Sequence, residues 1–181
     1  MAHNQKQINS PYWKHKKIVK CSKSVTGVDI LKDEVEYLNT RGYHFVHMDA
    51  TSDGYLGEKF DIVHAGDVIE HVDNIGGLLA FAKRHCKKDG TILISTCCPF
   101  FYEAVFSFMR KQGPRDNMEH VSWITPQNMN ELCCRTGLEF VCTYYLIAGI
   151  WGYRLLNFVR KGILPKEYFT SIYIYELKLL E

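Results

Sequence analysis

The chain has 181 residues, of which 46% are hydrophobic and 23% are charged, and its formal net charge is +2. These proportions describe a folded globule and exclude a disordered tail, a collagen-like repeat and a membrane protein with many spans. The length suits one domain of ordinary size, which can bury a core without help from metals or disulfides.

The first 24 residues form a basic lead-in segment, whose six lysines all precede the first acid of the chain, Asp29. Such a segment can contact phosphates or acidic lipids, but a solvated helix face or terminal arm is the commoner explanation. Because acids and bases nearly balance over the whole chain, nucleic acid is not the expected partner. We therefore expect a lead-in at 1–24, followed by one domain at 25–181.

From residue 25 onward, short β-rich runs alternate with helical segments. The predicted strands cover residues 25–30, 43–50, 60–65, 91–96, 138–145 and 168–179. The predicted helices cover residues 31–41, 76–88, 101–111 and a segment that starts after Thr125 and stops at Gly137, with a weaker pattern at 155–161. Strands separated by helices predict parallel pairing, whereas the last two strands can add in antiparallel fashion at one edge. The predicted fold class is α/β, with an open, twisted, mostly parallel sheet, helices on both faces and an antiparallel C-terminal edge strand.

The chain has seven cysteines, an odd number, and no C-x-x-C spacing. No secretion signal opens it, so we expect reduced thiols in a cytoplasmic protein. Cys97 and Cys98 end the fourth predicted strand, and because no nucleophile-activating motif surrounds them, packed thiols are favoured. The one long apolar stretch, residues 141–159, is interrupted by glycines, Arg154 and Asn157, so we expect no membrane span.

Acidic and small residues stand at the carboxyl ends of the predicted strands, where open α/β sheets bind ligands. Asp29 ends the first strand, Asp49 and Ala50 end the second, and Gly66 follows the third. Two acids on neighbouring strand tips suit a nucleoside, because one can accept both ribose hydroxyls and the other can take the adenine amino group. Gly66 would let the backbone approach that ligand closely. Alternatively, Asp29 could serve only as a cap for the helix that follows it.

Four segments resemble successive motifs of class I S-adenosylmethionine-dependent methyltransferases. They are VTGVDI at 25–30, FVHMDA at 45–50, FDIVHAGDVIEHV at 60–72 and KKDGTILIST at 87–96. A fifth segment, HVSWIT at 120–125, resembles a subgroup that acts on small hydroxylated, sugar or quinone-like acceptors. The resemblance runs from about residue 25 through most of the chain.

The resemblance implies a Rossmann-like fold with S-adenosylmethionine as the cofactor. It also implies transfer of a methyl group to a small-molecule acceptor, a hydroxyl of a sugar or related metabolite, as in ubiquinone-type O-methyltransferases. The implied cofactor contacts are Asp29, Ile30, Asp49, Ala50 and Gly66. Of these, Asp29 would hold the ribose, Asp49 and Ala50 the adenine, and Gly66 the region beside the methionine part.

The first motif of the family is missing. That motif is a strand followed by a glycine-rich loop, in which glycines allow a tight turn beside the ligand, yet the first glycine of this chain is Gly27. In the family the strand lies mid-sheet, so this fold would be incomplete at its N-terminal side. Either the sheet is repacked without the strand, or residues 12–21 form a lead-in helix over the gap. The loss leaves an alternative function, a non-catalytic scaffold that binds a partner.

A cluster of metal-ligand side chains follows the third predicted strand. Asp67, Glu70 and His71 have the i, i+3, i+4 spacing of one helical face, and His120 comes from a later loop. Together they could hold a divalent metal such as Mg²⁺ that acidifies an acceptor hydroxyl, an arrangement similar to the metal-assisted branches of the family. Alternatively, Glu70 and His71 brace the loop. Without a metal, His71 or His120 could act as the general base, because imidazole titrates near neutrality.

Overall fold

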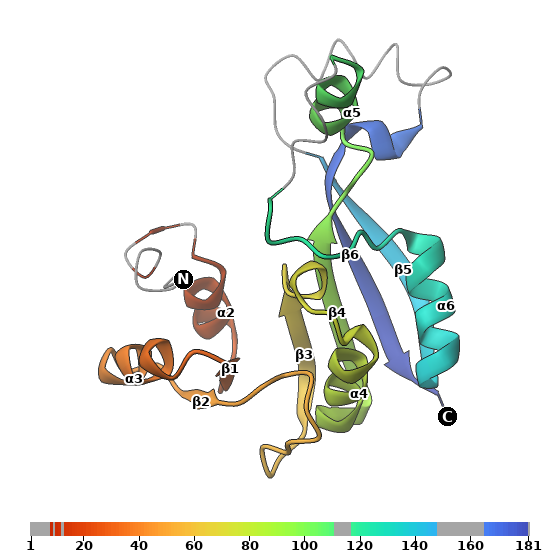
Figure 1. Cartoon of the computed structure of the whole chain (residues 1–181). Coiled ribbons are helices and arrows are strands. Elements are labelled where there is room, and N and C mark those ends of the chain that lie inside the picture. Colours follow the sequence, from red (N-terminus) through yellow and green to blue (C-terminus); the bar gives the residue numbers. More distant parts are fainter. Residues whose placement is uncertain (1–7, 9, 12, 111–116, 148–164, 181) are drawn as a thin grey trace. The chain divides into compact units, whose positions relative to one another are not determined.

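The computed structural model describes residues 8, 10, 11, 13–110, 117–147 and 165–180. The strands are β1 (Gly27–Asp29), β2 (Phe45–His47), β3 (Phe60–Gly66), β4 (Cys86–Cys97), β5 (Leu138–Ile147) and β6 (Thr170–Leu179) (Figure 1). The helices are α2 (Lys14–Cys21), α3 (Lys32–Thr40), α4 (Ile75–His85), α5 (Tyr102–Met109), α6 (Pro126–Thr136) and the short 3₁₀ helices η1 (Ile69–His71) and η2 (Lys166–Phe169). The α/β class is confirmed.

The chain divides into two compact units, residues 1–54 and 55–181. The predicted boundary after residue 24 stays a prediction, and the two units are described separately below. In the part of the chain that the structure describes, no helix is long and apolar enough to cross a membrane. Most of the apolar stretch at 141–159 and the weak helical pattern at 155–161 lie outside the described residues.

The described residues of the first unit form one parallel strand pair and two helices. β1 and β2 run side by side in the register Gly27 to Phe45, and α3 connects them. A small apolar core holds the unit together, made of Ile8, Trp13, Val35, Leu38 and Phe45. Residues 14–21 of the lysine-rich lead-in form helix α2, and no residue of this helix is buried.

No described residue before Gly27 lies in a strand, and the described strands form two separate sheets. This division agrees with the predicted loss of the family's mid-sheet strand, because β1 and β3 would be its two neighbours. A helix precedes β1, where the family has a strand and glycine-rich loop.

The second unit contains a four-stranded sheet in the order β3-β4-β6-β5. β3 and β4 are parallel, while β6 runs antiparallel to both β4 and β5. The antiparallel direction of the C-terminal strand was predicted, but its place at the edge is corrected, because β6 is inserted between β4 and β5 and the edge strand is β5. Tyr173, Tyr175 and Leu177, which share one face of β6, are completely buried.

One face of this sheet forms the main core. Ile92 and Ile94 of β4 pair with Leu177 and Tyr175 of β6, and none of these four side chains is exposed. Helices α4 and α6 pack on this face (Figure 1), and the Tyr175 hydroxyl donates to the carbonyl oxygen of Ile124 at 2.6 Å, just before α6. The core therefore lies between these two helices and the central strands.

The opposite face of the same sheet is more exposed. Ile62, Leu93 and Ile174 occupy the alternate positions, and Ile62 keeps 60% of its surface accessible. The prediction placed helices on both faces of the sheet. In the described part of this unit, the helices that pack on the sheet, α4 and α6, lie on the buried face.

The end of α4 differs from its prediction. The helix stops at His85, and residues 86–88, predicted to be helical, open strand β4. The buried His85 ring accounts for the stop: its Nδ1 lies 2.8 Å from the Phe81 carbonyl oxygen, and its Nε2 accepts from the Leu56 N–H at 3.0 Å. The next residue, Cys86, is fully buried and pairs with Phe60 of β3, so the sheet begins directly after the helix.

Candidate functional site

The carboxyl ends of β1 and β2 bring Asp29 and Asp49 onto neighbouring strand tips. Asp29 stands opposite His47 in the strand register, and its carbonyl oxygen accepts from the Met48 N–H at 3.1 Å. Its Oδ1 accepts from the Leu31 N–H at 2.9 Å, a turn contact just before α3, whose N-cap residue Leu31 makes no side-chain cap bond. The side chain of Ile30, which lies between Asp29 and Leu31 in the sequence, is 61% exposed.

Asp49 is exposed and anchors the turn that follows β2. Its Oδ1 accepts two hydrogen bonds from Thr51, from the backbone N–H at 2.7 Å and from the hydroxyl at 2.8 Å. These donors stabilise the ionised carboxylate and hold the pKa of Asp49 below its usual value. Ala50, which lies between Asp49 and Thr51 in the sequence, is half-buried.

Gly66 ends β3 in the second unit. A Cβ at this position would lie 2.5 Å from the imidazole ring of His64, so the absence of a side chain makes room for that ring. The next residue, Asp67, has a positive φ of 57°, a conformation that Asp tolerates better than most residues. Its Oδ1 accepts from the Ser95 hydroxyl at 2.9 Å.

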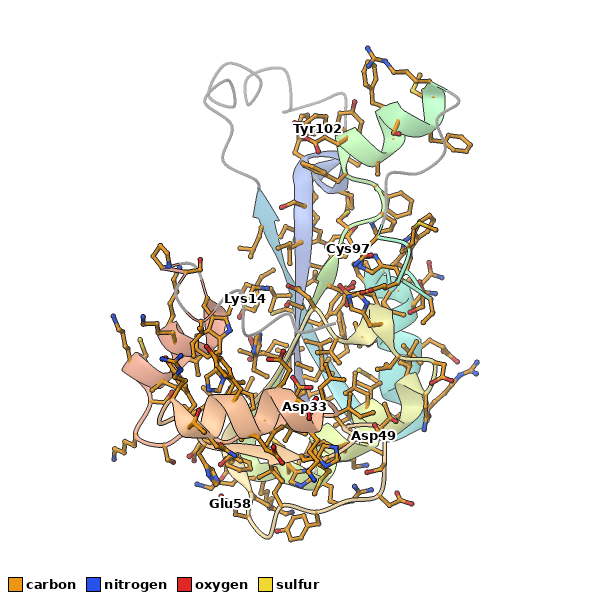
Figure 2. The ribbon with its side chains drawn as sticks, turned by 60° about the vertical axis from the view of Figure 1, so that its left-hand side comes forward. Lys14, Asp33, Asp49, Glu58, Cys97 and Tyr102 are labelled. Carbon is orange, nitrogen blue, oxygen red and sulfur yellow. The ribbon has the colours of Figure 1, made fainter. Side chains whose placement is uncertain are left out.

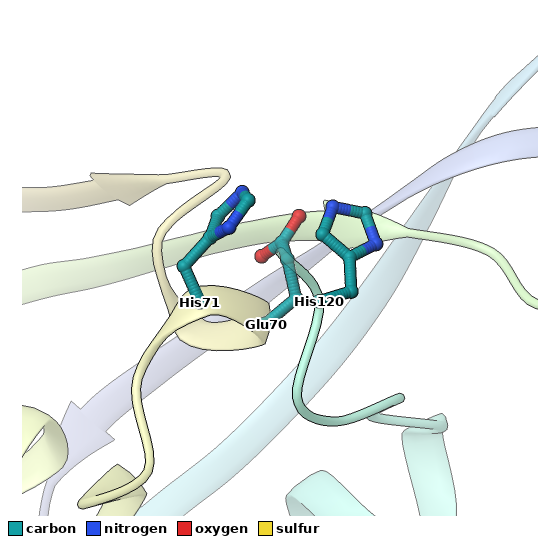
Figure 3. A group of neighbouring side chains, drawn as sticks. All are labelled: Glu70, His71 and His120. Carbon is teal, nitrogen blue, oxygen red and sulfur yellow. The ribbon is translucent and has the colours of Figure 1, made fainter. Parts of the chain in front are cut away.

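Glu70, His71 and His120 form a group whose ligand atoms lie within 4.8 Å of one another (Figure 3). The structure does not bring Asp67 into this group, because its left-handed backbone and its bond to Ser95 engage the carboxylate with β4 instead. The metal set predicted from the sequence is therefore reduced to three side chains.

Backbone contacts between η1 and the later loop hold this group together. The Val121 N–H donates to the Glu70 carbonyl oxygen at 2.8 Å, and the Ser122 hydroxyl to that of Ile69 at 3.4 Å. His120 is thereby placed beside η1, and its ring meets the His71 ring edge-on with centroids 4.7 Å apart. The two predicted general bases are thus neighbours.

The group is rich in lone pairs. Glu70 is only 2% exposed, and its buried Oε2 has no hydrogen-bond partner. His71 Nδ1 lies 3.3 Å from the carbonyl oxygen of Glu119, which can only accept, so Nδ1 carries the proton and Nε2 keeps its lone pair. A buried, unpartnered carboxylate oxygen beside such a ring is suited to a group that brings positive charge or a hydrogen-bond donor.

One further side chain belongs to this site. The Sγ of Cys97, at the end of β4, lies 3.7 Å from Nδ1 of His120. Sequence reasoning assigned Cys97 to packing, although its position at a strand end was a signal of proximity to the site. The buried Cys98 does match a packed thiol, because its Sγ donates to the Glu167 carbonyl oxygen at 3.5 Å.

All seven cysteines are free thiols, as the odd count and the spacing predicted. Burial raises the pKa of the Cys133 thiol to about 11 and keeps it protonated at neutral pH. Cys21 and Cys134 are exposed, and each lies on a helix outside the group of Glu70.

Comparison with known proteins supports the methyltransferase resemblance. A family model described as a methyltransferase domain matches residues 15–143. The curated relatives include the ubiquinone biosynthesis O-methyltransferases of Rickettsia prowazekii (strain Madrid E) and Rickettsia canadensis (strain McKiel), 27% and 24% identical over 126 residues, or 64% of this chain. The chain spans about half the length of these relatives, 50% and 53% respectively.

Solved structures show the same fold at low sequence identity. A SAM-dependent methyltransferase from Archaeoglobus fulgidus superposes with a TM-score of 0.62 at 17% identity, covering 84% of this chain and 75% of that one. Magnesium protoporphyrin IX methyltransferase from Synechocystis PCC 6803, solved with bound SAH, gives a TM-score of 0.57 at 14% identity and covers 91% and 67%. The family model accounts for more than half of the residues, and the chain therefore belongs to the class I S-adenosylmethionine-dependent methyltransferases.

Proposed function

We propose that this protein transfers a methyl group from S-adenosylmethionine to a hydroxyl of a small-molecule acceptor. The proposal is carried by the group of Glu70, His71 and His120, in which a buried carboxylate oxygen without a partner lies beside two imidazoles. S-adenosylmethionine supplies the activated methyl group when bound. This chain must then position the acceptor hydroxyl and provide an atom that takes its proton.

Asp29 and Asp49 would hold the adenosine part of the cofactor. Both stand at the tips of paired strands, and each carboxylate presents lone pairs to ribose or adenine donors in addition to its turn contact. The lowered pKa of Asp49 keeps it ionised and acceptor-only at neutral pH. By family resemblance, Ile30 and Ala50 would flank the adenosine, and the backbone of Gly66 would adjoin the methionine part.

The acceptor hydroxyl would donate its proton into the group of Glu70. His71 is the better base of the two imidazoles on this geometry, because its Nδ1 is engaged with the Glu119 carbonyl and its Nε2 can accept. The Glu70 carboxylate would then stabilise the imidazolium that forms. Removing the proton as the methyl group arrives makes the acceptor oxygen a stronger nucleophile.

A divalent metal is a second way in which the same group could act. One carboxylate and two imidazoles form a ligand set that suits Zn²⁺ or Mn²⁺ as well as Mg²⁺, and the unpartnered Oε2 of Glu70 fits a cation. These residues would hold the metal, whose charge would acidify the acceptor hydroxyl. Activity that survives EDTA, together with an unchanged melting temperature in Mg²⁺, Mn²⁺ or Zn²⁺, would remove the metal and leave the histidines as bases.

A non-catalytic scaffold that binds a partner is the alternative function. It is favoured by one observation: helix α2 precedes β1 where the family has a strand and a glycine-rich loop, and the chain has no glycine before Gly27. Backbone N–H groups of such a loop normally approach the cofactor, so their loss would weaken its binding.

Calorimetric titration with S-adenosylhomocysteine separates the two functions. We expect saturable binding by the wild type and a loss of roughly tenfold or more in affinity for Asp29→Asn, because the hydrogen bonds from the ribose to a charged acceptor are weakened. Asp33→Asn, which makes the same charge change on the exposed side of α3, is the matched control and should bind like the wild type. No heat at millimolar ligand would rule out the enzyme and leave the scaffold.

The acceptor class is tested with the protein and labelled S-adenosylmethionine. The names of the curated relatives point to aromatic quinone precursors, and the family resemblance also allows sugars, so a dihydroxybenzene and a monosaccharide are the two probes. We expect methyl transfer to oxygen that His71→Ala reduces at least tenfold without weakening S-adenosylhomocysteine binding.

The free thiols suit the cytoplasmic setting that the sequence predicts.

A further inference from the structure

The His120 ring lies beside two other side chains, those of Glu70 and Cys97. One of its nitrogens faces Glu70, and the other is turned away (Figure 3). The nitrogen that is turned away is Nδ1, which lies 3.7 Å from the Sγ of Cys97, a distance within hydrogen-bond range for sulfur. Cys97 lies at the end of β4 (Figure 2).

Both partners of this contact are anchored by the backbone. Cys97 pairs with Ile172 of β6, and the next residue along the chain donates its N–H to the Ser171 carbonyl at 2.9 Å. On the other side, the His120 N–H donates to the Asn117 carbonyl at 3.0 Å, and the following residue is paired with Glu70. Because the sulfur sits on a sheet strand and the ring on a pinned loop, the contact can define the orientation of the ring.

A neutral imidazole carries one proton, so the partner of one nitrogen decides the state of the other. We propose that Cys97 is a positioning residue for His120: its sulfur accepts the Nδ1 proton and leaves the Nε2 lone pair facing Glu70. The inference rests on the proposed function, in which His120 works through Nε2 as a base or a metal ligand. It gives His120 the same tautomer as His71, whose Nδ1 lies beside the Glu119 carbonyl oxygen.

The tautomer of His120 matters on the side of the ring that faces Glu70. The buried Oε2 of Glu70 has no hydrogen-bond partner, and it faces the His120 nitrogen that lies away from Cys97 (Figure 3). With the proton on Nδ1, Nε2 of His120 faces Glu70 as an acceptor, which is the form that binds a cation or accepts from a hydroxyl. Cys97 thereby sets the tautomer of His120 without contacting the ligand itself.

Nitrogen-15 NMR of the histidine rings tests the tautomer directly, without cofactor or acceptor and at one fixed pH. The His120 signals are assigned by their loss in His120→Gln. In the wild type we expect a protonated Nδ1 and an unprotonated Nε2. Cys97→Ala should shift the ring toward the other tautomer, and Cys97→Ser, whose oxygen can accept the same proton, should restore part of the wild-type pattern. Cys134→Ala, an exposed thiol on α6, should change nothing.

Kinetics provide the second readout. We expect Cys97→Ala to lower kcat about tenfold while the affinity for S-adenosylhomocysteine is unchanged, with partial rescue in Cys97→Ser. A wild-type His120 protonated on Nε2, or an identical tautomer in Cys97→Ala, would overturn the inference. If the wild type lacks methyl-transfer activity altogether, the proposed function fails, while the NMR result still decides the role of Cys97.

Discussion

The carboxylates at the ends of β1 and β2 each hold their own turn. Oδ1 of Asp29 accepts from the Leu31 N–H, and Oδ1 of Asp49 accepts from both donors of Thr51. Such local bonds fix the side chains against the backbone before any ligand arrives. The turn contact of Asp29 is therefore compatible with the nucleoside interpretation, because a side chain held in place loses less freedom when it binds a ligand.

The bonds to Thr51 make stability depend on the ionisation of Asp49. Its folded pKa lies below its unfolded value, so its contribution to the free energy of unfolding is present above the unfolded pKa of about 4 and is lost as pH falls through the folded value. We expect Asp49→Asn to lower the urea midpoint at pH 6 and to reduce the loss of stability between pH 5 and pH 3.

Thr51→Val is the matched control for this prediction. It removes the hydroxyl donor and keeps the backbone N–H, so its pH dependence should fall between those of the wild type and Asp49→Asn. Equal slopes for all three proteins below pH 5 would show that the Thr51 contacts do not affect the ionisation of Asp49.

At the scale of elements, α6 is bounded by local signals at both ends. The Thr125 hydroxyl accepts from the Asn128 N–H, and the Asn128 side chain accepts from the Thr125 N–H in return, with Pro126 in the first turn. At the other end, Gly137 takes the left-handed conformation with φ of 64°, and its carbonyl accepts from Lys83 at 2.8 Å. By contrast, α4 stops at His85, whose buried ring accepts from the Leu56 N–H, and the sequence around α4 does not predict this distant contact.

Removal of the N-cap should destabilise the second unit measurably. Thr125→Ala leaves the Asn128 N–H without its acceptor, and we expect a loss of about 1 kcal/mol in the free energy of unfolding by urea. Thr125→Ser keeps the hydroxyl and should lose much less. If the alanine and serine variants unfold at the same urea concentration, the capping bond is not what stabilises the start of α6.

At the scale of the whole molecule, the two units differ in how much core they enclose. Among the described residues, the first has three-residue strands and a core of five buried side chains, whereas the second buries the central strands β4 and β6 beneath α4 and α6. Both predicted adenosine contacts, Asp29 and Asp49, lie in the unit with the smaller core. Local opening is easiest where few apolar contacts are lost.

Hydrogen exchange of the intact protein tests this difference. We expect the amides of β1 and β2 to exchange through openings of lower free energy than those of β4 and β6, and we expect S-adenosylhomocysteine to raise the protection of β1 and β2 selectively. Asp29→Asn should lose that ligand effect and keep the pattern of the free protein. Equal protection in both units without ligand would contradict the argument from core size.

The sequence alone determined the elements whose signals are local. Alternation of β-rich and helical segments established the α/β class, the Thr125 and Gly137 caps bounded α6, and strand-end positions brought Asp29 and Asp49 together. Spacing and family resemblance also predicted that Glu70, His71 and His120 lie together, and their ligand atoms are within 4.8 Å of one another. These features depend on hydrogen bonds within a few residues, or on a strand order that the family shares.

Only the tertiary structure decided the features that depend on contacts between distant residues. The insertion of β6 between β4 and β5 is set by pairing between residues far apart in the sequence, since Ile94 lies opposite Tyr175 and Tyr144 lies opposite Ile174. Asp67 has a left-handed backbone, and its carboxylate accepts from the Ser95 hydroxyl, so it does not join Glu70, His71 and His120. The contact of Cys97 with His120 arises because the end of β4 and the loop before α6 meet in space, and residue types and spacing do not specify that meeting.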